Sequence, residues 1–572
     1  MDFANVDAGE FNERYDTGHV PERQRIPGFL TQQRWIGAEN SKLSVATYDL
    51  DSMVSTRTRD PGRRWTSPYR RSYRPARIRE LPMKRIAAAF VVIAAGAAAH
   101  AAVITPGQVA NDILPPILPS GIAVALAPFV VVPDQGAPQY VQPIRDGSGR
   151  IAINDVNGRL YVTTPAATSL GTPYLDLTTA VTGFDGNFMG AAFAPDFATS
   201  GRFYTVYQAA AGTGITPIGS STPGFDDIII KEWTAANPNA TTFTGTSREA
   251  MRISMPSQGH TVGTIAFNPN ATAPANPDYG MLYIGMGDTG DSGSLLLNGQ
   301  NLSNPYGKVL RIDPTASGGA SFTIPAGNPF AGQPGKEGAI WAYGFRNPQQ
   351  FSWEIGGQQR MFIADIGEAH VEEVNIGIAG GNYGWSTREG TFATFNDLAL
   401  GLPLSLNDYK LNGAREPGLL FPAAQYDHRE GNAIGGGLLY QGKKIPALVG
   451  KYIVSDIVNG RLLVVDATNL VSTDDPSLVE GFSELDLLHN GTRESLLNIL
   501  GTSRADARLG EDENGDLFLS TKHGGTIFQL GLVTDVPEPE VPPSAIALLA
   551  GLLWLSTKSR AAFRPNRARS CC

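Results

Sequence analysis

The hydrophobic pattern is not helical through most of the chain. Between residues 102 and 532, short apolar and aromatic runs alternate with Gly, Asp, Asn and Pro, and no long stretch repeats at helical spacing. Short apolar runs bounded by turn-forming residues are typical of β-strands joined by turns. The pattern therefore predicts an all-β domain over residues 102–532.

One strand element recurs across this domain. It is a turn residue followed by a short β-rich run with an aromatic or other large apolar side chain near its start, and its six copies begin at Gly158, Gly201, Gly280, Arg360, Lys451 and Gly515. Six copies in about 430 residues leave roughly 70 residues each, enough for a four-stranded propeller blade with long loops. We therefore predict a six-bladed β-propeller. A pair of β-sandwiches is the alternative, but it leaves more edge strands exposed.

A secretory signal peptide is predicted at residues 83–101. Two basic residues follow Met83, the apolar run 86–99 comes next, and small residues at its end suit a signal peptidase. A buried helix is the alternative. Residues 1–82 are Arg-rich near their end and lack apolar periodicity, so they are predicted to be a non-native or disordered extension, with translation starting at Met83. A basic regulatory tail is the alternative for that segment.

Residues 533–572 have the pattern of a sorting segment. Pro537-Glu538-Pro539 is followed by the apolar run 545–555 and then by five basic residues. This arrangement resembles the PEP-CTERM segment of Gram-negative bacteria, which implies cleavage near the Pro-Glu-Pro motif. We therefore predict an exported protein of the periplasm, outer surface or extracellular matrix, with export and sorting machinery among its partners. Membrane contact is then transient; a short single-pass anchor is the alternative.

Composition narrows the classes of function. Charged residues make up 17 % of the chain and the formal net charge is −9, so the sequence indicates no nucleic-acid partner. Gly (65 residues) and Pro (40 residues) are abundant, as suits a β protein with many turns. The only cysteines are Cys571 and Cys572, so the all-β domain is predicted to fold without a disulfide.

Four segments carry a more specific pattern, and they cover residues 186–197, 259–288, 307–348 and 364–385. They include Gly-Phe-Arg-Asn-Pro, which ends at Pro348, and Gly-Gly-Asn-Tyr-Gly-Trp, which ends at Trp385. In order and spacing, these segments resemble the glucose/sorbosone dehydrogenase family across most of the all-β domain. The resemblance implies a six-bladed propeller that binds pyrroloquinoline quinone (PQQ) and calcium in its mouth. It also implies the oxidation of an aldose sugar to its lactone.

The resemblance assigns roles to residues at this mouth. His260 falls at the catalytic histidine, and a neutral imidazole can accept the hydroxyl proton while an alcohol loses hydride. Arg346 and Asn347 match an Arg-Asn pair at the cofactor, where a guanidinium would stabilise charge on a quinone oxygen, so Arg346 is assigned to catalysis and to PQQ binding. Arg504 and Arg508 lie close to the arginines that bind the PQQ carboxylates. A turn histidine and a structural arginine are the alternatives.

The calcium site is assigned in the same way. Glu372 matches an acidic ligand, Gly367 and Glu368 match positions that ligate through backbone carbonyls, and Tyr383 is a further donor. Calcium prefers several oxygen ligands, and at this place it would polarise and orient the quinone. A solvated acidic loop is the alternative interpretation.

Two positions depart from the family pattern. A late lysine that binds PQQ falls near Val458 here, and Asp185 stands where a glutamine is usual; Arg461 or Lys522 could substitute for the lysine. Fold alone does not fix function. A non-enzymatic surface or matrix propeller that binds carbohydrate or protein is therefore the second hypothesis, and a calcium-dependent lactonase is the third.

Overall fold

The chain divides into two units, residues 1–108 and 109–572. The computed structural model describes the backbone of 32–36 and 44–48, and residues 114–533 except 135, 212–213, 220–224, 258, 291–296, 316–317, 369, 396–404 and 408–416. In the first unit, β1 (Gln32–Ile36) pairs antiparallel with β2 (Ser44–Tyr48). The predicted signal peptide, nearly all of the sorting segment and most of the N-terminal extension lie outside the described residues, and those predictions stand as made.

The sheets of the second unit are antiparallel except where β10 (Ile218–Gly219) pairs with β12 (Gly245–Ser254) and where β3 (Leu118–Val131) pairs with β27 (Ser483–His489). One contains β4 (Pro138–Pro143), β5 (Ile151–Asp155), β6 (Arg159–Thr163) and β7 (Leu175–Asp176). The next contains β8 (Phe184–Phe193), β9 (Arg202–Ala209), β11 (Asp227–Ala235), β12 (Gly245–Ser254) and β10 (Ile218–Gly219). A third contains β13 (Val262–Phe267), β14 (Leu282–Met286), β15 (Lys308–Ile312) and β16 (Ile340–Tyr343). A fourth contains β17 (Pro348–Trp353), β18 (Met361–Asp365), β19 (Val371–Ile376) and β23 (Ala424–Asp427).

The largest sheet joins the two ends of the domain. Its strands, in spatial order, are β24 (Ile434–Leu439), β25 (Lys451–Asp456), β26 (Leu462–Asp466), β27 (Ser483–His489), β3 (Leu118–Val131), β31 (Thr526–Gly531), β30 (Leu517–Thr521) and β29 (Ala507–Glu511), and β28 (Thr492–Arg493) pairs with β27. β3 pairs antiparallel with β31 and parallel with β27. The first strand of the domain is therefore held by its last strands, which closes the architecture without a free end at that point.

The remaining elements of the second unit are short. A small sheet is formed by β20 (Arg388–Glu389), β21 (Phe392–Phe395) and β22 (Ser405–Asn407). Among the described residues, the helices are α3 (Leu177–Ala180), α4 (Phe197–Ser200) and α5 (Leu496–Leu500), with 3₁₀ turns η3 (Asn298–Gln300), η4 (Pro446–Leu448), η5 (Ala467–Asn469), η6 (Pro476–Leu478) and η7 (His523–Gly525). None of the helices in the described part of the chain has the length and apolar character needed to span a bilayer.

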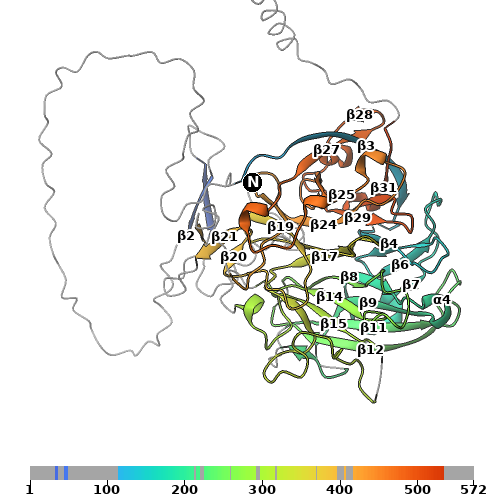
Figure 1. Cartoon of the computed structure of the whole chain (residues 1–572). Helices are drawn as coiled ribbons and strands as arrows, with labels where there is room; N and C mark the ends of the chain where they lie inside the picture. Colours follow the sequence, from blue (N-terminus) through green and yellow to red (C-terminus); the bar gives the residue numbers. More distant parts are fainter. Residues whose placement is uncertain are drawn as a thin grey trace, which may run out of the picture. The chain divides into compact units, whose positions relative to one another are not determined.

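Strands β4, β8, β13, β17, β24 and β29 contact one another in this order in a closed ring, and we call the axis of this ring the channel. The labels of five of them gather in the middle of the domain in Figure 1. Neighbouring inner strands bond at matching depths: Gln142 Nε2 donates to the Ala191 carbonyl at 2.8 Å, and Ser352 Oγ donates to the Gly437 carbonyl at 2.8 Å. These strands run in the same direction, so their first residues lie at one end of the channel. We call that end the mouth.

The hydrophobic core lies between neighbouring sheets rather than in one central mass. Tyr204 and Ile228 of one sheet, for example, pack with Leu282 and Ile284 of the next, and all four are buried. Because each sheet covers an apolar face of its neighbour, burial holds the sheets in radial order. The all-β, propeller-like fold predicted from the sequence is confirmed.

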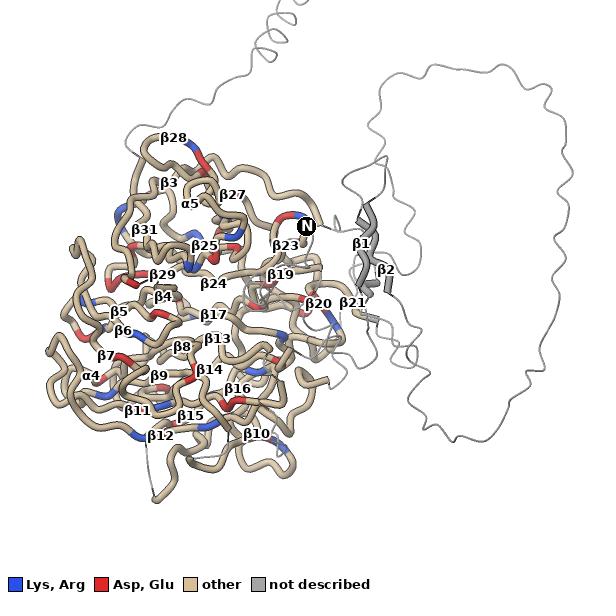
Figure 2. The backbone as a smooth tube through the Cα atoms, turned by 180° about the vertical axis from the view of Figure 1, so that it is seen from behind, with Lys and Arg blue, Asp and Glu red and all other residues tan. Residues whose placement is uncertain are grey.

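The recurring element predicted from the sequence is a strand at every copy, namely β6, β9, β14, β18, β25 and β30. Five of these are the second strand of their sheet, counted from the channel, whereas β6 is the third. Figure 2 shows Lys and Arg positions interspersed with Asp and Glu positions along the described backbone.

Candidate active site

His260 lies two residues before β13, at the mouth of the channel. Its Nδ1 lies 2.6 Å from Asp288 Oδ1, and the side chain is 10 % exposed. A carboxylate only accepts hydrogen bonds, so Nδ1 carries the proton and Nε2 keeps its lone pair. No described residue hydrogen-bonds Nε2. The imidazole is therefore fixed in the tautomer that a general base requires.

Asp288 is buried, with 1 % of its side chain exposed. Burial by itself would raise its pKa, but His260, Arg346 and the Trp385 indole lower the pKa of Asp288 below its ordinary value. Trp385 Nε1 donates to Oδ2 at 2.8 Å, and the backbone N–H of Asp288 donates to the Arg346 carbonyl at 2.8 Å. An ionised, immobilised carboxylate thus orients His260.

The backbone around His260 is tightly constrained. His260 has φ of +40°, and an added Cβ at Gly287 would lie 2.3 Å from the His260 carbonyl oxygen. Only glycine fits at position 287 without moving the histidine loop. The histidine position therefore depends on its neighbour in the hairpin as well as on Asp288.

Arg346 and Asn347 come directly before β17 at the same end of the channel. Their backbone N–H groups donate to Asp365, at 3.0 Å and 2.6 Å. The Arg346 guanidinium pairs with Glu368, with Nε to Oε2 at 2.7 Å, and Nη1 donates to the Gly367 carbonyl at 2.7 Å. The guanidinium also lies 5.8 Å from the centre of the Trp385 ring.

Arg508 is the second residue of β29 and is 6 % exposed. Its Nη1 lies 3.4 Å from the Ala507 carbonyl, and its Nε has no hydrogen-bond partner among the described residues. No carboxylate in the described part of the chain pairs with it. A buried cation without a counter-charge is costly, which makes this guanidinium suited to an anionic ligand. Arg504, in contrast, already donates from Nε to Asp506 at 2.8 Å.

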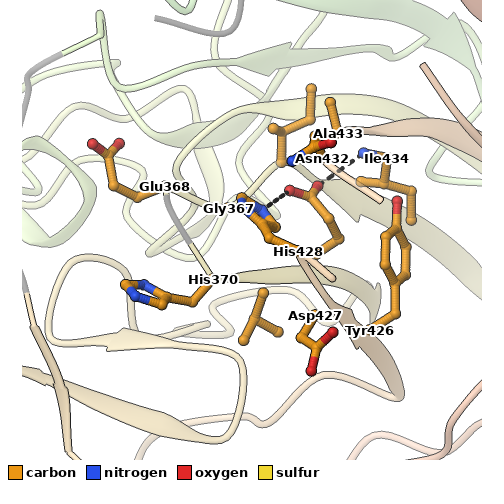
Figure 3. Close-up of polar contacts among 12 residues, drawn as sticks. Gly367, Glu368, His370, Tyr426, Asp427, His428, Asn432, Ala433 and Ile434 are labelled. Carbon is orange, nitrogen blue, oxygen red and sulfur yellow. Dashed lines mark hydrogen bonds and ion pairs between the residues drawn. The ribbon is translucent and has the colours of Figure 1, made fainter. Parts of the chain in front are cut away.

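The residues assigned to calcium do not converge on one point. Glu372 is fully buried; its Oε1 lies 2.7 Å from His428 Nε2, and its Oε2 accepts from the Ile434 N–H at 2.8 Å (Figure 3). Burial raises the pKa of Glu372, and His428 opposes that rise. In Figure 3, Glu368 points away from His428. Both carboxylate oxygens of Glu372 are therefore already bonded within the protein.

The other assigned donors are engaged as well. The Gly367 carbonyl and the Glu368 carboxylate bond Arg346, and Tyr383 Oη lies 2.6 Å from the Ile376 carbonyl. Among the described residues, no group of three or more His, Cys, Asp or Glu is arranged to hold a metal ion. The four assigned donors thus do not form the oxygen cage that calcium prefers.

A buried carboxylate holds the loop that carries Gly367 and Glu368. Glu389 Oε1 accepts the backbone N–H groups of Glu368, His370 and Val371 at 2.9, 2.9 and 3.0 Å. Burial would raise the pKa of Glu389, but His370, His428 and these N–H bonds lower it to about 2. This structural role was not predicted from the sequence.

The replacements considered for the missing lysine are placed differently. Val458 lies in the turn between β25 and β26, where its N–H donates to Asp456 at 2.9 Å. Arg461 is paired with Glu430 and Glu484 at 2.7 and 2.8 Å. Lys522 directly precedes η7. Arg461 is therefore occupied by protein carboxylates, and Arg508 is the better cation for a ligand.

PQQ is a tricarboxylate quinone, and the described residues fit such a group. Arg508 offers a buried guanidinium with an orphaned Nε, and Arg346 and Asn347 border the same mouth. Charge-assisted hydrogen bonds to carboxylates favour guanidinium donors. The fit rests mainly on Arg508, because Glu368 already neutralises Arg346.

Residues 137–484 match the sequence profile of the family described as Glucose / Sorbosone dehydrogenase. The chain belongs to this family. The match begins just before β4 and ends in β27, so it contains His260 and Arg346 and stops before β29 with Arg508.

The relatives are matched over only part of their own length. The chain is 29 % identical over 363 residues to the HIPL2 protein of Arabidopsis thaliana, covering 54 % of this chain and 49 % of that one. It is 23 % identical over 413 residues to the Hedgehog-interacting protein of Mus musculus, covering 69 % and 50 %. The chain therefore spans about half the length of these relatives.

A solved structure shares the fold. The soluble aldose sugar dehydrogenase of Escherichia coli in its apo-form superposes with a TM-score of 0.50 at 19 % identity, covering 72 % of this chain and all of that one. At this identity the likeness concerns the fold alone.

Sequence reasoning missed Asp288 and His428 as site residues. Asp288 ends the segment 259–288, and the hairpin register could have revealed it: Val262 pairs with Met286, so His260 and Asp288, two positions beyond them, lie together. His428 is separated from Glu372 by 56 residues, and no local pattern links them.

Proposed function

We propose that the chain is a PQQ-dependent oxidoreductase that oxidises an aldose sugar to its lactone. The observation that carries the proposal is the fixed His260–Asp288 pair at the mouth, where Nε2 has no described partner. The family profile, which is that of sugar dehydrogenases, supports the same class of reaction.

His260 supplies the proton chemistry. Oxidation of the anomeric hydroxyl removes a hydride from carbon and a proton from oxygen, and His260 Nε2 accepts that proton. Asp288, 2.6 Å from Nδ1, stabilises the imidazolium that results. When bound, PQQ supplies the two-electron oxidant that takes up the hydride.

The arginines supply the cofactor site. Arg508 is proposed to bind a PQQ carboxylate through its guanidinium, whose Nε has no partner among the described residues. Arg346 and Asn347 are proposed to lie against the quinone end, with their backbone anchored to Asp365. Arg504 is proposed as a secondary contact, since it must share its charge with Asp506.

Calcium has no step in this proposal. The family resemblance implies it, but Glu372 is bonded to His428 and Ile434, and the Gly367 carbonyl to Arg346. We propose that PQQ binds without the calcium site made from Gly367, Glu368, Glu372 and Tyr383.

We further propose that residues 102–532 form six blades. Buried clusters link successive inner-strand sheets all the way round: Ile144 with Phe203, Tyr204 with Leu282, Tyr283 with Ile363, Phe362 with Tyr452, Ile453 with Leu519, and Phe518 with Ile153. In this interpretation the large sheet is two blades joined edge to edge where β27 meets β3. The domain is proposed to be exported through the signal at residues 83–101 and sorted through residues 533–572.

A non-enzymatic propeller that binds carbohydrate or protein is the second candidate. The ion pair between Arg346 and Glu368 favours it, because this pair neutralises the cation that the reaction would use. The match to a protein named for its interaction with Hedgehog points the same way.

Steady-state kinetics separate the two candidates. The purified exported protein, reconstituted with PQQ, is assayed by dye reduction with a panel of aldoses, beside His260→Ala and His489→Ala. His489 is a partly exposed histidine on β27 and serves as the matched control. The proposal expects a loss of about 10²–10⁴ in rate for His260→Ala alone. Equal rates in all three proteins, or no PQQ binding by the wild type, would favour the binding propeller.

A further inference from the structure

A cavity of about 320 Å³ lies at the end of the channel opposite the mouth. It is lined by the later residues of the inner strands and the turns after them, including Gln142, Arg145, Phe193, Phe267, Trp353 and Glu511. His260, Arg346 and Arg508 are not among its lining residues. We call it the distal cavity. Its volume lies at the lower end of the range for small-molecule sites, which suits a ligand of about one ring.

Tyr140 closes the distal cavity toward the mouth. This residue of β4 is 5 % exposed, and its Oη lies 3.2 Å from the Gln349 carbonyl on β17 and 3.3 Å from the Gly263 carbonyl on β13. The Gln349 amide donates to the same oxygen at 3.3 Å. Because Tyr140 bonds across the channel to two other inner strands, a ligand in the distal cavity is separated from His260.

The charges of the distal cavity cancel. Arg145 Nη2 lies 2.6 Å from Glu511 Oε1, and the two side chains are 33 % and 17 % exposed. The remaining polar lining residues are uncharged: Tyr140, Gln142, Thr264, Asn268, Thr272, Gln350 and Ser352. A ligand with net charge would meet repulsion from one member of the pair, so the lining favours a neutral ligand.

The hydrogen-bonding groups left over are mainly acceptors. Gln142 uses its amide N–H on the Ala191 carbonyl, which leaves its oxygen open. Unpaired acceptors are satisfied by a ligand that donates, and hydroxyl groups do so.

Aromatic rings provide the other half of the lining. Phe193, Phe267, Phe351 and Trp353 all border the distal cavity. A pyranose ring has an apolar C–H face that packs on an aromatic ring, while its hydroxyls point outward to polar groups. Aromatic rings, neutral acceptors and a balanced charge pair together match a sugar better than a hydrocarbon or an ion.

The rim of the distal cavity includes a strained residue. Arg145 has φ of +57°, a conformation that side chains other than glycine adopt rarely. Its side chain is the one paired with Glu511. Such strain is often found where a side chain must be presented to a ligand.

We propose that the distal cavity is a second binding site, for a neutral carbohydrate of monosaccharide size, independent of the catalytic mouth. The proposal does not depend on the oxidation of sugar at His260. It gives the propeller a ligand site on the face that the dehydrogenase reaction does not use.

Calorimetric titration of the exported protein without PQQ tests the proposal. The His260→Ala variant is titrated with D-glucose, D-galactose and D-xylose, so that no turnover occurs. Saturable binding of at least one sugar is expected. Adding Glu511→Gln or Gln142→Met should each weaken that binding about tenfold, the usual effect of losing one good hydrogen bond to a ligand.

Matched variants distinguish the two ends of the channel. Arg508→Gln, at the mouth, should leave sugar binding at the distal cavity unchanged, and Glu511→Gln should leave dye-linked sugar oxidation of the PQQ-loaded wild-type background unchanged. The proposal is overturned if none of the three sugars binds, if both cavity variants bind like the parent, or if Arg508→Gln abolishes binding. Gln142→Met keeps the test decisive should Glu511→Gln fail to fold.

Discussion

Replacing Asp288 by asparagine tests how the site activates His260. The change keeps the size of the side chain and its acceptor for the Trp385 indole, but removes the negative charge 2.6 Å from Nδ1. An amide can also present its NH₂ group to Nδ1, which favours the tautomer with the proton on Nε2 and removes the lone pair that accepts the hydroxyl proton.

The magnitude follows from the burial of the pair. Two unit charges about 4 Å apart interact by about 4 kcal/mol at an effective dielectric constant of about 20. Asp288 is 1 % exposed, so solvent screens the interaction little. If about two-thirds of this energy is expressed at the transition state, kcat falls about 100-fold.

The assay is dye-linked aldose oxidation by PQQ-loaded protein, with kcat and KM measured separately. Because Asp288 acts through His260 and is not proposed to touch the sugar, KM should change less than threefold, a bound of the order expected when no ligand contact is lost. Asp466→Asn, at a half-exposed site on β26, is the control and should match the wild type. A kcat for Asp288→Asn within a few-fold of wild type would refute the proposed role of the pair.

Four further predictions follow from named contacts. Arg508→Gln should weaken PQQ binding, read by cofactor absorbance, by about 10–100-fold while the melting temperature stays near that of the wild type, since its guanidinium holds little protein structure; unchanged affinity would remove Arg508 from the cofactor site. Gly287→Ala should lower kcat because its Cβ would lie 2.3 Å from the His260 carbonyl oxygen, and wild-type kinetics would contradict this. Chelation of divalent cations should leave the melting temperature unchanged, and a lowered one would restore the calcium site at Glu372. Glu389→Gln should destabilise the fold near neutral pH by about 3 kcal/mol, because the folded pKa of Glu389, about 2, lies below the ordinary 4.5. The stabilisation by the carboxylate is complete above pH 4.5 and is lost as the pH falls toward 2. The difference in unfolding free energy between variant and wild type should therefore shrink over that window, and a constant difference would contradict the prediction.

The sequence predicted the strands because their signal is local. The recurring run at Gly280, for instance, is β14, and its neighbours in the sheet follow the same alternation of apolar and turn residues. The first copy, at Gly158, is the third strand of its sheet and not the second, because β5 and β6 have similar sequence patterns and only strand pairing distinguishes them. Order around the channel depends on contacts between sheets, which single strands do not encode.

The site was predictable where a motif fixed a backbone position and not where the partner was distant. His260 and Arg346 were found from their motifs, and both lie at the mouth. The partner of Glu372 is His428, brought there by the pairing of β19 with β23 and not by any local spacing. The bond to His428, and not the run of acidic residues in the sequence, therefore determines the structural role of Glu372.

The central claim is that this propeller transfers a hydride from an aldose to PQQ with His260 as the base. A single-turnover experiment tests it directly: PQQ-loaded protein is mixed with excess aldose, without dye, and the absorbance of the quinone is followed while the product is identified by NMR. The account predicts stoichiometric reduction of the quinone with formation of the lactone in the wild type, and reduction slowed by about 10²–10⁴ in His260→Ala that still holds PQQ. Quinone that stays oxidised in the wild type, or that is reduced equally fast in His260→Ala, would contradict the claim.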